Sequence, residues 1–252
     1  MSLPTTATPA LDIQHVTVRF GGVTALSDLS FQVQPGGRHG ILGPNGSGKT
    51  TLFNAITGFV KPAAGRVLLH GEEILRMPPH RRLRLGLART FQITSLFPSL
   101  TARDNVRLAA LARLGRHREA LRPANGDPEV NALADRMLAD LHLSHLADRI
   151  VYGLGYGEQR QIEIAVTLAT NPRILLLDEP TAGLSAAETD TVTALIQTLP
   201  EELTIVLIEH DLGVVFDLTD HLTVLQNGEL IADGPSAAVR EDPVVKAVYL
   251  GT

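Results

Sequence analysis

One octapeptide constrains this chain more than any other stretch: GPNGSGKT, residues 43–50, which fits the pattern G-x-x-x-x-G-K-[ST]. The apolar run RHGILG at 38–43 precedes it and predicts a buried strand. A helix is expected from Lys49 to about Thr57, ending near Gly58. Because the chain holds only three lysines, a chance match anywhere in it has a probability of roughly three in a thousand. The octapeptide therefore predicts a phosphate-binding loop, with a ligand-free glycine turn as the alternative.

Each residue type in this loop suits the phosphates of a nucleotide. Glycines let the backbone curl so that several N–H groups face one phosphate, and the helix N-terminus adds partial positive charge. Lys49 would bring its charge to the β- and γ-phosphates, and Thr50 would offer its hydroxyl to Mg²⁺. ATP and Mg²⁺ are therefore the expected ligands. The residues expected to contact the nucleotide are Gly43, Pro44, Asn45, Gly46, Ser47, Gly48, Lys49, Thr50 and Thr51.

Two carboxylates follow a predicted buried strand in the run RILLLDEP, residues 173–180. In proteins with such a phosphate loop, an Asp at the end of a buried strand holds Mg²⁺, and Asp178 stands at that place. Glu179 comes next, where a carboxylate can orient or deprotonate the water that attacks the γ-phosphate. The alternative is that Glu179 is only an acidic residue at a strand end.

Two further strand ends carry polar side chains. The run TIVLIEH at 204–210 delivers His210 to the carboxyl end of a strand, where ligands bind in α/β sheets. We expect His210 to donate a hydrogen bond near the γ-phosphate, although a lone histidine is more often structural. Gln92 ends the short strand ARTFQ at 88–92, and its amide is a candidate for contact with Mg²⁺ or the attacking water.

Composition excludes several classes of protein. The net charge is −5, so nucleic acid is not an expected partner. There are no cysteines, which excludes a disulfide framework and a thiolate metal site. No apolar run approaches the roughly 18 residues that span a bilayer, and the first residues lack the features of a signal peptide. We expect a cytosolic protein, or one held at a membrane surface by a partner.

The pattern of strands and helices predicts an α/β core interrupted by a helical insert. Residues 1–10 read as a flexible lead, 11–92 and 170–252 as the nucleotide-binding core, and 93–169 as a helical sub-domain. The arginine-rich stretch HRRLRLGLAR at 80–89 is expected to be a solvated helix face.

The order of these motifs resembles the ATP-binding subunit of an ABC transporter, over nearly the whole chain from about Leu11. The motifs are GPNGSGKT as Walker A, Gln92 as the Q-loop, LGYGE as the signature, ILLLDEP as Walker B, AGLS at 182–185 as the D-loop and His210 as the H-loop. The resemblance implies a P-loop NTPase (RecA-like) core with an antiparallel β sub-domain and an inserted α-helical sub-domain. It also places Phe20 where an aromatic ring stacks on adenine, with a strand-core residue as the alternative.

In that family two subunits pack head to tail, and the signature of one closes over ATP bound to the Walker A loop of the other. The resemblance therefore implies a second anion site, formed by Leu154, Gly155, Tyr156, Gly157 and Glu158. The sequence departs from the common LSGGQ form, because Gly155 stands where Ser is usual. A hydroxyl contact to the γ-phosphate is thereby lost. Ser185 likewise replaces the usual D-loop Asp.

Several stretches, including LGYGEQRQIEIA and the C-terminal run IADGPSAAVREDPVVKAVYLG, resemble the branched-chain or hydrophobic amino acid uptake branch. The resemblance implies an importer ATPase that is peripheral to the cytoplasmic face of a bacterial inner membrane. Its implied partners are a second ATPase subunit, identical or homologous, integral membrane permease subunits and, indirectly, a periplasmic or extracellular solute-binding protein. The loop SLFPSLT at 95–101 is expected either to receive a membrane subunit or to cap the helical sub-domain.

Other readings stay open at this point. ATPases for urea, amide or aromatic acid uptake and for lipopolysaccharide export look alike. A soluble ABC ATPase of DNA maintenance or translation would need long coiled-coil arms or a second Walker A loop, and neither is present. A P-loop kinase would leave LGYGE and His210 unexplained.

Overall fold

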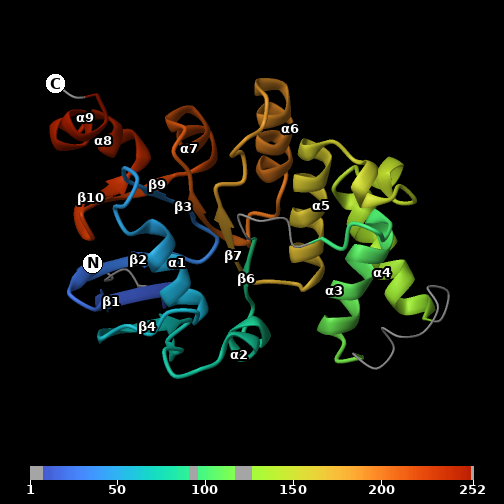
Figure 1. Ribbon diagram of the computed structural model, residues 1–252, viewed down its shortest axis with the longest axis horizontal. Helices are drawn as coiled ribbons and strands as arrows, with labels where there is room; N and C mark the ends of the chain where they lie inside the picture. The colour runs from blue at the N-terminus through green and yellow to red at the C-terminus, as the bar shows by residue number, and fades with distance from the viewer. Residues whose placement is uncertain (1–7, 91–95, 117–126, 251–252) are drawn as a thin grey trace, which may run out of the picture.

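The computed structural model describes residues 8–90, 96–116 and 127–250. Within these residues the strands form two sheets, one antiparallel and one mostly parallel, with helices packed around them (Figure 1). Gln92 and residues 1–7 of the predicted lead lie outside the described residues. Among the helices in the described part, none combines the length and the apolar character that a bilayer crossing requires.

The antiparallel sheet carries the sub-domain near the N-terminus. Its spatial order is β2-β1-β4-β5, and the strands are β1 (Leu11–Phe20), β2 (Val23–Val33), β4 (Ala64–Leu69) and β5 (Glu72–Glu73). Burial alternates along the first half of β1, as expected for a strand with one face on a core. Leu11 and Ile13 pair in register with Val33 and Phe31, and all four side chains are buried.

The second sheet has the spatial order β10-β9-β3-β8-β7-β6. Its strands are β3 (Arg38–Leu42), β6 (Leu87–Arg89), β7 (Ile174–Asp178), β8 (Thr204–Ile208), β9 (His221–Gln226) and β10 (Glu229–Pro235). All neighbours in it are parallel except β9 and β10. Those two form the hairpin expected from Asn227-Gly228, where both residues have positive φ angles of 50° and 81°.

Two hydrophobic cores lie on the two faces of this parallel sheet. Every residue of β7 and β8 is buried, as is typical of strands covered on both sides. Leu175 and Leu177 point into the core shared with the helical part, whereas Ile174 and Leu176 point into the core beneath the antiparallel sheet. The sheet is thus the layer that both halves of the molecule share, and its strand ends are held rigidly.

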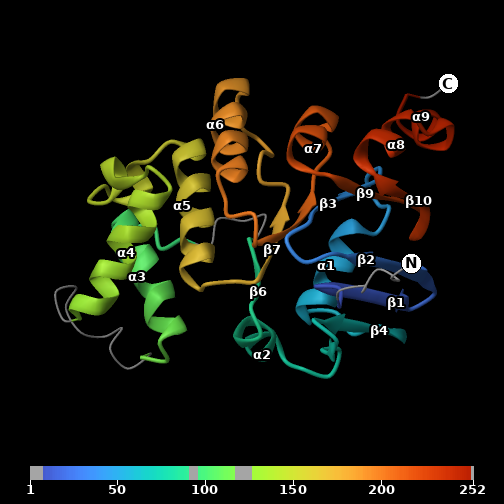
Figure 2. The same cartoon turned by 180° about the vertical axis from the view of Figure 1, so that it is seen from behind.

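The helices begin and end where sequence signals place them. The predicted helix over 49–57 is confirmed, and Gly58 ends it with a left-handed φ of 89°. The α-helices are α1 (Lys49–Thr57), α2 (Pro79–Arg84), α3 (Ala102–Arg113), α4 (Pro128–Asp140), α5 (Tyr156–Ala169), α6 (Ala186–Gln197), α7 (Leu212–Leu218), α8 (Ser236–Glu241) and α9 (Pro243–Leu250). Figures 1 and 2 show α3, α4 and α5 together at one side of the parallel sheet. The predicted class is confirmed, while the boundaries at 93 and 169 stay a prediction.

The expectation of a solvated helix face over 80–89 is wrong for two arginines. Helix α2 ends at Arg84, and the stretch continues into strand β6. Arg82 is 3% exposed and donates to the carbonyl oxygens of Ala55 and Ile56 at 2.8 and 2.6 Å, near the end of α1. A cation there satisfies carbonyl groups that have no partner within the helix. Arg89 is also buried, in the site described next.

Candidate nucleotide-binding and hydrolysis site

The loop between β3 and α1 is curled tightly enough to require glycine. Gly46 and Gly48 have positive φ angles of 81° and 105°, and a Cβ on Gly48 would come within 2.7 Å of the Ala25 carbonyl oxygen. The Ser47 hydroxyl is buried and has no hydrogen-bond partner among the described residues. The loop residues run without a break from the end of β3 into the first turn of α1: Gly43, Pro44, Asn45, Gly46, Ser47, Gly48, Lys49, Thr50 and Thr51. The buried hydroxyl and the open helix terminus fit an anion such as a phosphate group.

Lys49 is held by the loop itself. Its ammonium donates to the carbonyl oxygens of Gly43 and Pro44 at 2.6 and 3.1 Å. Burial lowers the pKa of Lys49, and the charges of Glu179 and Asp178 oppose that shift. The two carboxylates therefore act on Lys49 although they lie about 130 residues further along the chain. The structure brings the phosphate loop and the end of β7 together, as the sequence predicted.

Asp178 ends β7 and is 1% exposed. One of its oxygens, Oδ2, accepts a hydrogen bond from the Arg89 guanidinium at 2.6 Å. The other oxygen, Oδ1, is buried without a hydrogen-bond partner among the described residues. Thr50, the other residue predicted to hold Mg²⁺, is exposed in the first turn of α1. A hard cation prefers oxygen ligands, so the free carboxylate oxygen and the exposed hydroxyl fit Mg²⁺.

Arg89 is a site residue that sequence reasoning missed. It ends β6, which pairs with β7, and it also donates to Asn54 Oδ1 on α1 at 2.7 Å. The guanidinium thus joins α1 to the strand end that carries Asp178. The available signal was its position, because carboxyl ends of neighbouring parallel strands meet at one edge of the sheet.

Glu179 has an unusual backbone conformation. Its φ angle is +46°, in the left-handed region that non-glycine residues rarely adopt, and its N–H donates to the Ile208 carbonyl oxygen at 2.9 Å. Such a conformation costs on the order of 1–3 kcal/mol and persists only where the surroundings enforce it. The side chain is partly exposed, so solvent reaches it. The strained backbone turns this carboxylate out of the strand direction at the edge that carries the phosphate loop.

Glu209, a second residue that sequence reasoning missed, fixes the segment around His210. Its carboxylate is fully buried and accepts from the Thr181 backbone N–H at 2.9 Å and the Thr181 hydroxyl at 2.6 Å. It also accepts from the His210 backbone N–H at 3.2 Å. The His210 side chain itself is 61% exposed. Glu209 therefore ties the loop after Glu179 to the residue that carries the exposed imidazole.

Phe20 lies at the end of β1 and is 51% exposed. Its strand partner Val23 is 67% exposed, so the hairpin tip between β1 and β2 offers an apolar surface. The alternative that Phe20 is a strand-core residue is wrong. Its contact with adenine stays a prediction, and so does the role of Gln92.

The signature residues lie at the start of α5, and the N–H groups of both of their glycines already have acceptors. The Gly155 N–H donates to Glu158 Oε2 at 2.8 Å, and the Gly157 N–H donates to Glu188 Oε1 of α6 at 3.2 Å. Hydrogen bonds from Ser185 and from Gly157 hold the pKa of Glu188 below its usual value. Tyr156 is 43% exposed, and Leu154 is buried. Two carboxylates of the same chain therefore cap the predicted anion site.

The signature and the phosphate loop are separate on the chain. In Figures 1 and 2, strands β6 and β7 lie between α1 and α5. These strands separate the start of α5 from the phosphate loop of the same chain.

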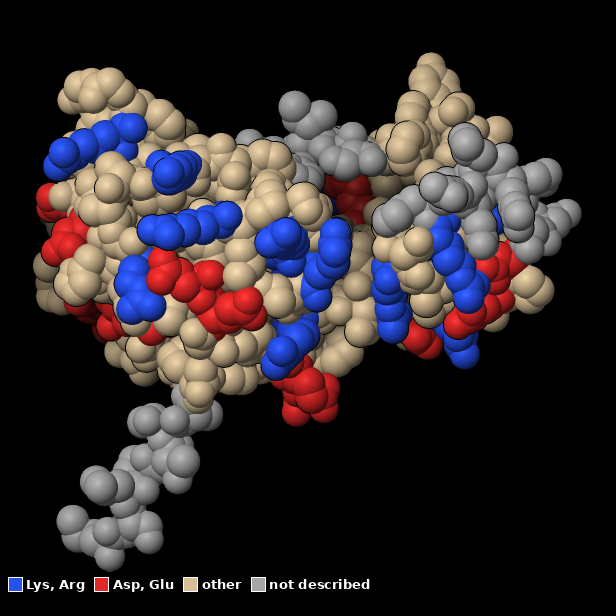
Figure 3. All heavy atoms as spheres, turned by 90° about the horizontal axis from the view of Figure 1, so that it is seen from below, with Lys and Arg blue, Asp and Glu red and all other residues tan. Residues whose placement is uncertain are grey.

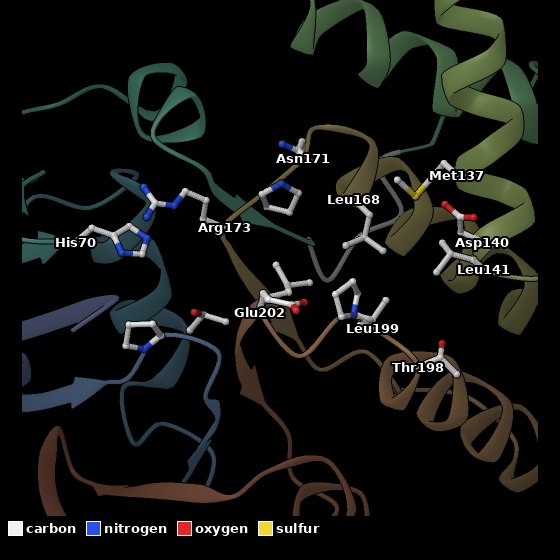
Figure 4. A pocket seen from close by; sticks show the side chains of 15 residues that line it. His70, Met137, Asp140, Leu141, Leu168, Asn171, Arg173, Thr198, Leu199 and Glu202 are labelled. Atoms are coloured by element: carbon white, nitrogen blue, oxygen red, sulfur yellow. The ribbon is translucent and has the colours of Figure 1, made fainter. Parts of the chain in front are cut away.

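The cavity in Figure 4 is a different feature. It has a volume of about 650 Å³, and His70, Arg173, Glu202 and Asp140 contribute to its lining. Arg173 and Thr204 stand at the amino ends of β7 and β8, whereas Asp178 stands at a carboxyl end. This cavity therefore lies at the opposite edge of the sheet from the phosphate loop and is not the nucleotide site.

Comparison with known proteins agrees with the geometry. Residues 26–182 match the ABC transporter family, and residues 229–252 match the family of branched-chain amino acid ATP-binding cassette transporters. The chain is 40% identical over 250 residues to the high-affinity branched-chain amino acid transport ATP-binding protein BraF of Pseudomonas aeruginosa. That alignment covers 96% of this chain and 98% of BraF.

Solved structures give the same result. The ADP conformation of MJ1267, an ATP-binding cassette of an ABC transporter, matches with a TM-score of 0.86 at 32% identity, covering 97% of this chain and 99% of that one. The dimeric post-hydrolysis state of the cassette MJ0796, bound to ADP and Pi, matches with a TM-score of 0.74 at 26% identity, covering 90% and 98%. The resemblance drawn from the motifs is confirmed: this chain belongs to the ABC transporter family, as an ATP-hydrolysing subunit similar to those of branched-chain amino acid import.

Proposed function

We propose that this subunit hydrolyses MgATP at an interface between two ATPase subunits and thereby drives uptake of branched-chain or other hydrophobic amino acids. One observation carries the proposal: Arg89 donates both to Asn54 of α1, the helix that Lys49 begins, and to Asp178 at the end of β7, so the phosphate loop and the strand-end carboxylates lie at the same edge of the sheet. Binding of a nucleotide would draw the Lys49 ammonium from the Gly43 and Pro44 carbonyl oxygens to the phosphates, a stronger charge-assisted partner.

The described residues leave ligands for Mg²⁺. We assign the Thr50 hydroxyl and Asp178 Oδ1 to the ion, while Arg89 keeps Asp178 Oδ2 in place. When bound, Mg²⁺ supplies positive charge to the β- and γ-phosphate oxygens. Gln92 is assigned to the same neighbourhood on its sequence position.

Glu179 is the proposed general base. Its strained backbone aims a partly exposed carboxylate at the phosphate edge, where it would orient the attacking water and accept a proton from it. His210 would donate a hydrogen bond to the γ-phosphate from its exposed imidazole. Glu209 is a positioning residue. It accepts hydrogen bonds from Thr181, in the loop after Glu179, and from the backbone N–H of His210. Phe20 would stack on the adenine from the exposed hairpin tip.

The second half of the site would come from the partner subunit. The start of α5, residues 154–158, would approach the γ-phosphate of a nucleotide bound by the other subunit. Glu158 and Glu188 now accept the N–H groups of this segment, so ATP-dependent closure would require them to release Gly155 and Gly157. Because no serine hydroxyl stands at Gly155, these backbone groups carry a larger share of the contact.

A groove beside α2 is the proposed contact with a membrane permease subunit. Its volume is about 340 Å³, and its lining includes Phe59, which is 59% exposed, Leu83, which is 40% exposed, and Val166. Helix α2 contributes the exposed Arg81 and Arg84 beside this groove. Figure 3, the view from below, shows several Lys and Arg side chains near the middle of that face of the molecule. An apolar floor with a basic rim suits a permease helix that carries apolar and acidic residues.

This contact would hold the subunit at the cytoplasmic face of the inner membrane. Phe97 is 56% exposed, whereas Leu96 is buried in the helical core. Two roles were expected for residues 95–101. The exposed Phe97 is available to a membrane subunit, whereas the buried Leu96 caps the helical sub-domain.

The test is uptake by vesicles that contain the subunit with its permease and solute-binding partners. Leucine, isoleucine and valine should be transported with ATP, and Glu179→Gln should stop transport while leaving the complex assembled. Transport of urea, amides or aromatic acids in place of these amino acids would contradict the proposed cargo. Loss of assembly in the Glu179→Gln complex would contradict the assignment of that residue to hydrolysis.

A further inference from the structure

A polar cluster lies at the edge of the parallel sheet that faces away from the phosphate loop. It contains His39 of β3, His221 and Thr223 of β9, and Asp233 of β10. His39 is the second residue of β3, whereas the phosphate loop follows the last residue of that strand. No role in nucleotide binding has been assigned to any of these four side chains.

Strand register brings the four side chains together. His39 pairs with His221 in the parallel register of β3 and β9, and Thr223 pairs with Asp233 in the antiparallel register of β9 and β10. His221 and Thr223 are two residues apart, so both point to the same face of the sheet. The cluster is therefore fixed by the backbone of three adjacent strands and does not depend on flexible loops.

Hydrogen bonds connect the cluster, but one buried nitrogen remains. His39 Nε2 lies 2.7 Å from the Thr223 hydroxyl oxygen, and that hydroxyl donates to Asp233 Oδ1 at 2.5 Å. His221 Nε2 lies 3.3 Å from the same Asp233 oxygen, yet it is buried and has no hydrogen bond among the described residues. Buried polar atoms without a partner are uncommon, and an ion is one of the occupants that explain them.

We propose that His39, His221 and Asp233 form a binding site for a divalent transition-metal ion, with Zn²⁺ as the best match. One ligand atom from each residue can be chosen so that all three lie within 4.8 Å of one another. Within the described part of the chain, this is the group of histidines and acids that meets that criterion. Two imidazoles and one carboxylate are a zinc ligand set, whereas Mg²⁺ and Ca²⁺ take oxygen ligands.

The ring geometry suits one shared ion. The His39 and His221 ring centres are 4.8 Å apart with 31° between the ring planes. Two imidazoles bound through nitrogen to one tetrahedral Zn²⁺ have ring centres on the order of 5 Å apart, given Zn–N bonds of about 2.0–2.1 Å. Binding through His39 Nε2 would move its proton to Nδ1, and the Thr223 hydroxyl would stay on Asp233 and orient that carboxylate.

An ion has room to enter. A cavity of about 540 Å³ opens over the cluster, and its lining includes Phe31, Gly37 and Asp220 together with the three proposed ligands. Three protein ligands leave a fourth position for water from this cavity. Because β3 and the hairpin of β9 and β10 are about 180 residues apart in the chain, an ion held by all three strands would stabilise the folded state.

Zinc titration of the untagged, nucleotide-free chain tests the site. Isothermal titration calorimetry should give one Zn²⁺ per chain with a dissociation constant in the micromolar range or below. The His221→Ala and Asp233→Asn variants should each bind at least ~10-fold more weakly. His221 is 37% exposed and Asp233→Asn preserves side-chain shape, so these changes spare the core.

A matched control separates this site from ordinary surface binding. His15 and Asp28 form an exposed pair at 2.8 Å without a second histidine, so His15→Ala should leave zinc affinity unchanged. Zn²⁺ should also raise the unfolding temperature of the wild-type and His15→Ala chains, but not that of His221→Ala or Asp233→Asn. The proposal is overturned if the His221→Ala and Asp233→Asn chains bind Zn²⁺ as tightly as wild type, or if wild type binds only at millimolar concentrations.

Discussion

The phosphate edge of the sheet and the start of α5 are both proposed to contact ATP. They differ in how many of their polar groups already have hydrogen-bond partners within the chain. At the phosphate edge, Lys49 rests on backbone carbonyl oxygens, and Asp178 keeps one buried oxygen without a partner. At the start of α5, by contrast, Glu158 and Glu188 already accept the N–H groups of Gly155 and Gly157. The phosphate edge keeps groups available to a ligand, whereas both signature glycines already donate to carboxylates of the same chain.

This difference suggests a sequence of events for the ATPase cycle. Nucleotide binding to the open subunit requires only that Lys49 exchange neutral oxygens for charged ones, which is favourable. Closure of the dimer requires α5 to exchange two carboxylates for a phosphate, which gains less because the N–H groups were already satisfied. The signature of this chain would therefore act as the weaker half of the composite site.

The largest expected effect is the loss of ATP-dependent dimers in Gly157→Asp. The new carboxylate would stand beside Glu188, whose Cγ would lie 2.8 Å from an added Cβ, and against the partner's phosphates. Like-charge contacts in a closed interface cost several kcal/mol. In a Glu179→Gln background, size-exclusion chromatography with MgATP should show wild-type signature chains as dimers and Gly157→Asp chains as monomers that still bind ATP.

Mixing variants checks that the site works between subunits. A Lys49→Ala chain and a Gly157→Asp chain should form ATP-dependent dimers together although neither does alone, because both defects then fall in one of the two sites. Gly153→Asp is the control, since a Cβ at Gly153 meets no atom within 4 Å. If Gly157→Asp dimerises as well as wild type, the start of α5 is only a helix end. If wild type forms no dimer, the test should be repeated with a homologous ATPase as partner.

Arg89→Met should cause the next largest effect, a loss of folding stability. The Arg89 and Asp178 side chains are both buried, at 6% and 1% exposure, so removal of Arg89 takes away the cation that is hydrogen-bonded to this carboxylate. Such changes cost about 3–5 kcal/mol. Urea unfolding measures the loss, and Arg103→Met is the control because its ion pairs with Asp135 and Asp148 are partly exposed and worth at most about 1 kcal/mol. If Arg89→Met lowers the free energy of unfolding by less than Arg103→Met does, the phosphate edge does not depend on Arg89 for its stability.

Glu179→Gln should slow ATP hydrolysis at least ~10²-fold, the usual contribution of a general base. Nucleotide affinity should change little, because the amide keeps the size of the side chain and Lys49 still holds the phosphates. Turnover and binding of a fluorescent ATP analogue measure the two effects separately. Glu72→Gln, on the exposed strand β5, is the control for loss of one surface charge. Near-normal turnover in Glu179→Gln would show that Glu179 is not the general base.

The same two regions differ in how far the sequence could predict them. Lys49, Thr50, Asp178 and Glu179 could be predicted as site residues because each follows or ends a strand whose apolar pattern is visible locally. The residues that were missed act across the fold: Arg89 contacts Asp178 across 89 positions, Glu209 contacts Thr181 across 28, and Glu188 contacts Gly157 across 31. Their roles depend on which strands and helices become neighbours in the fold. Local patterns in one sequence do not show which elements these are.

The arginine-rich stretch shows the same limit in the fold itself. A helix with several arginines suggests a solvated face, and Arg81 and Arg84 are indeed exposed. Arg82 is buried because the last carbonyl oxygens of α1 lie beside it and need donors. The sheets, the hairpin at Asn227-Gly228 and the end of α1 at Gly58 follow from local signals, whereas the burial of a charged side chain follows from its tertiary neighbours.

The smallest expected effect tests the carboxylate that caps the signature. Glu188→Gln keeps one side-chain oxygen, which can still accept from the Ser185 N–H and hydroxyl, so the start of α6 should stay folded. The amide nitrogen then replaces the oxygen that accepted from the Gly157 N–H, which loses its acceptor. The substitution removes a negative charge from the surface that would face the partner's γ-phosphate. ATP-dependent dimers of the Glu179→Gln, Glu188→Gln chain should therefore be a few-fold tighter than those of Glu179→Gln alone. Analytical ultracentrifugation over a range of protein concentrations measures the difference.

Two controls test whether charge causes the tighter dimers of Glu188→Gln: a series of salt concentrations and the variant Asp190→Asn. At about 1 M salt the screening length falls to about 3 Å, so the advantage of Glu188→Gln should shrink towards zero. Asp190→Asn, an exposed acid on the same helix, should change dimer affinity less than Glu188→Gln at any salt concentration. If Glu188→Gln instead weakens dimers at low salt, Glu188 orders the start of α5 for the partner's nucleotide rather than competing with it. The two regions would then be equally prepared for ATP, because the carboxylate would hold the backbone of the signature in its binding form.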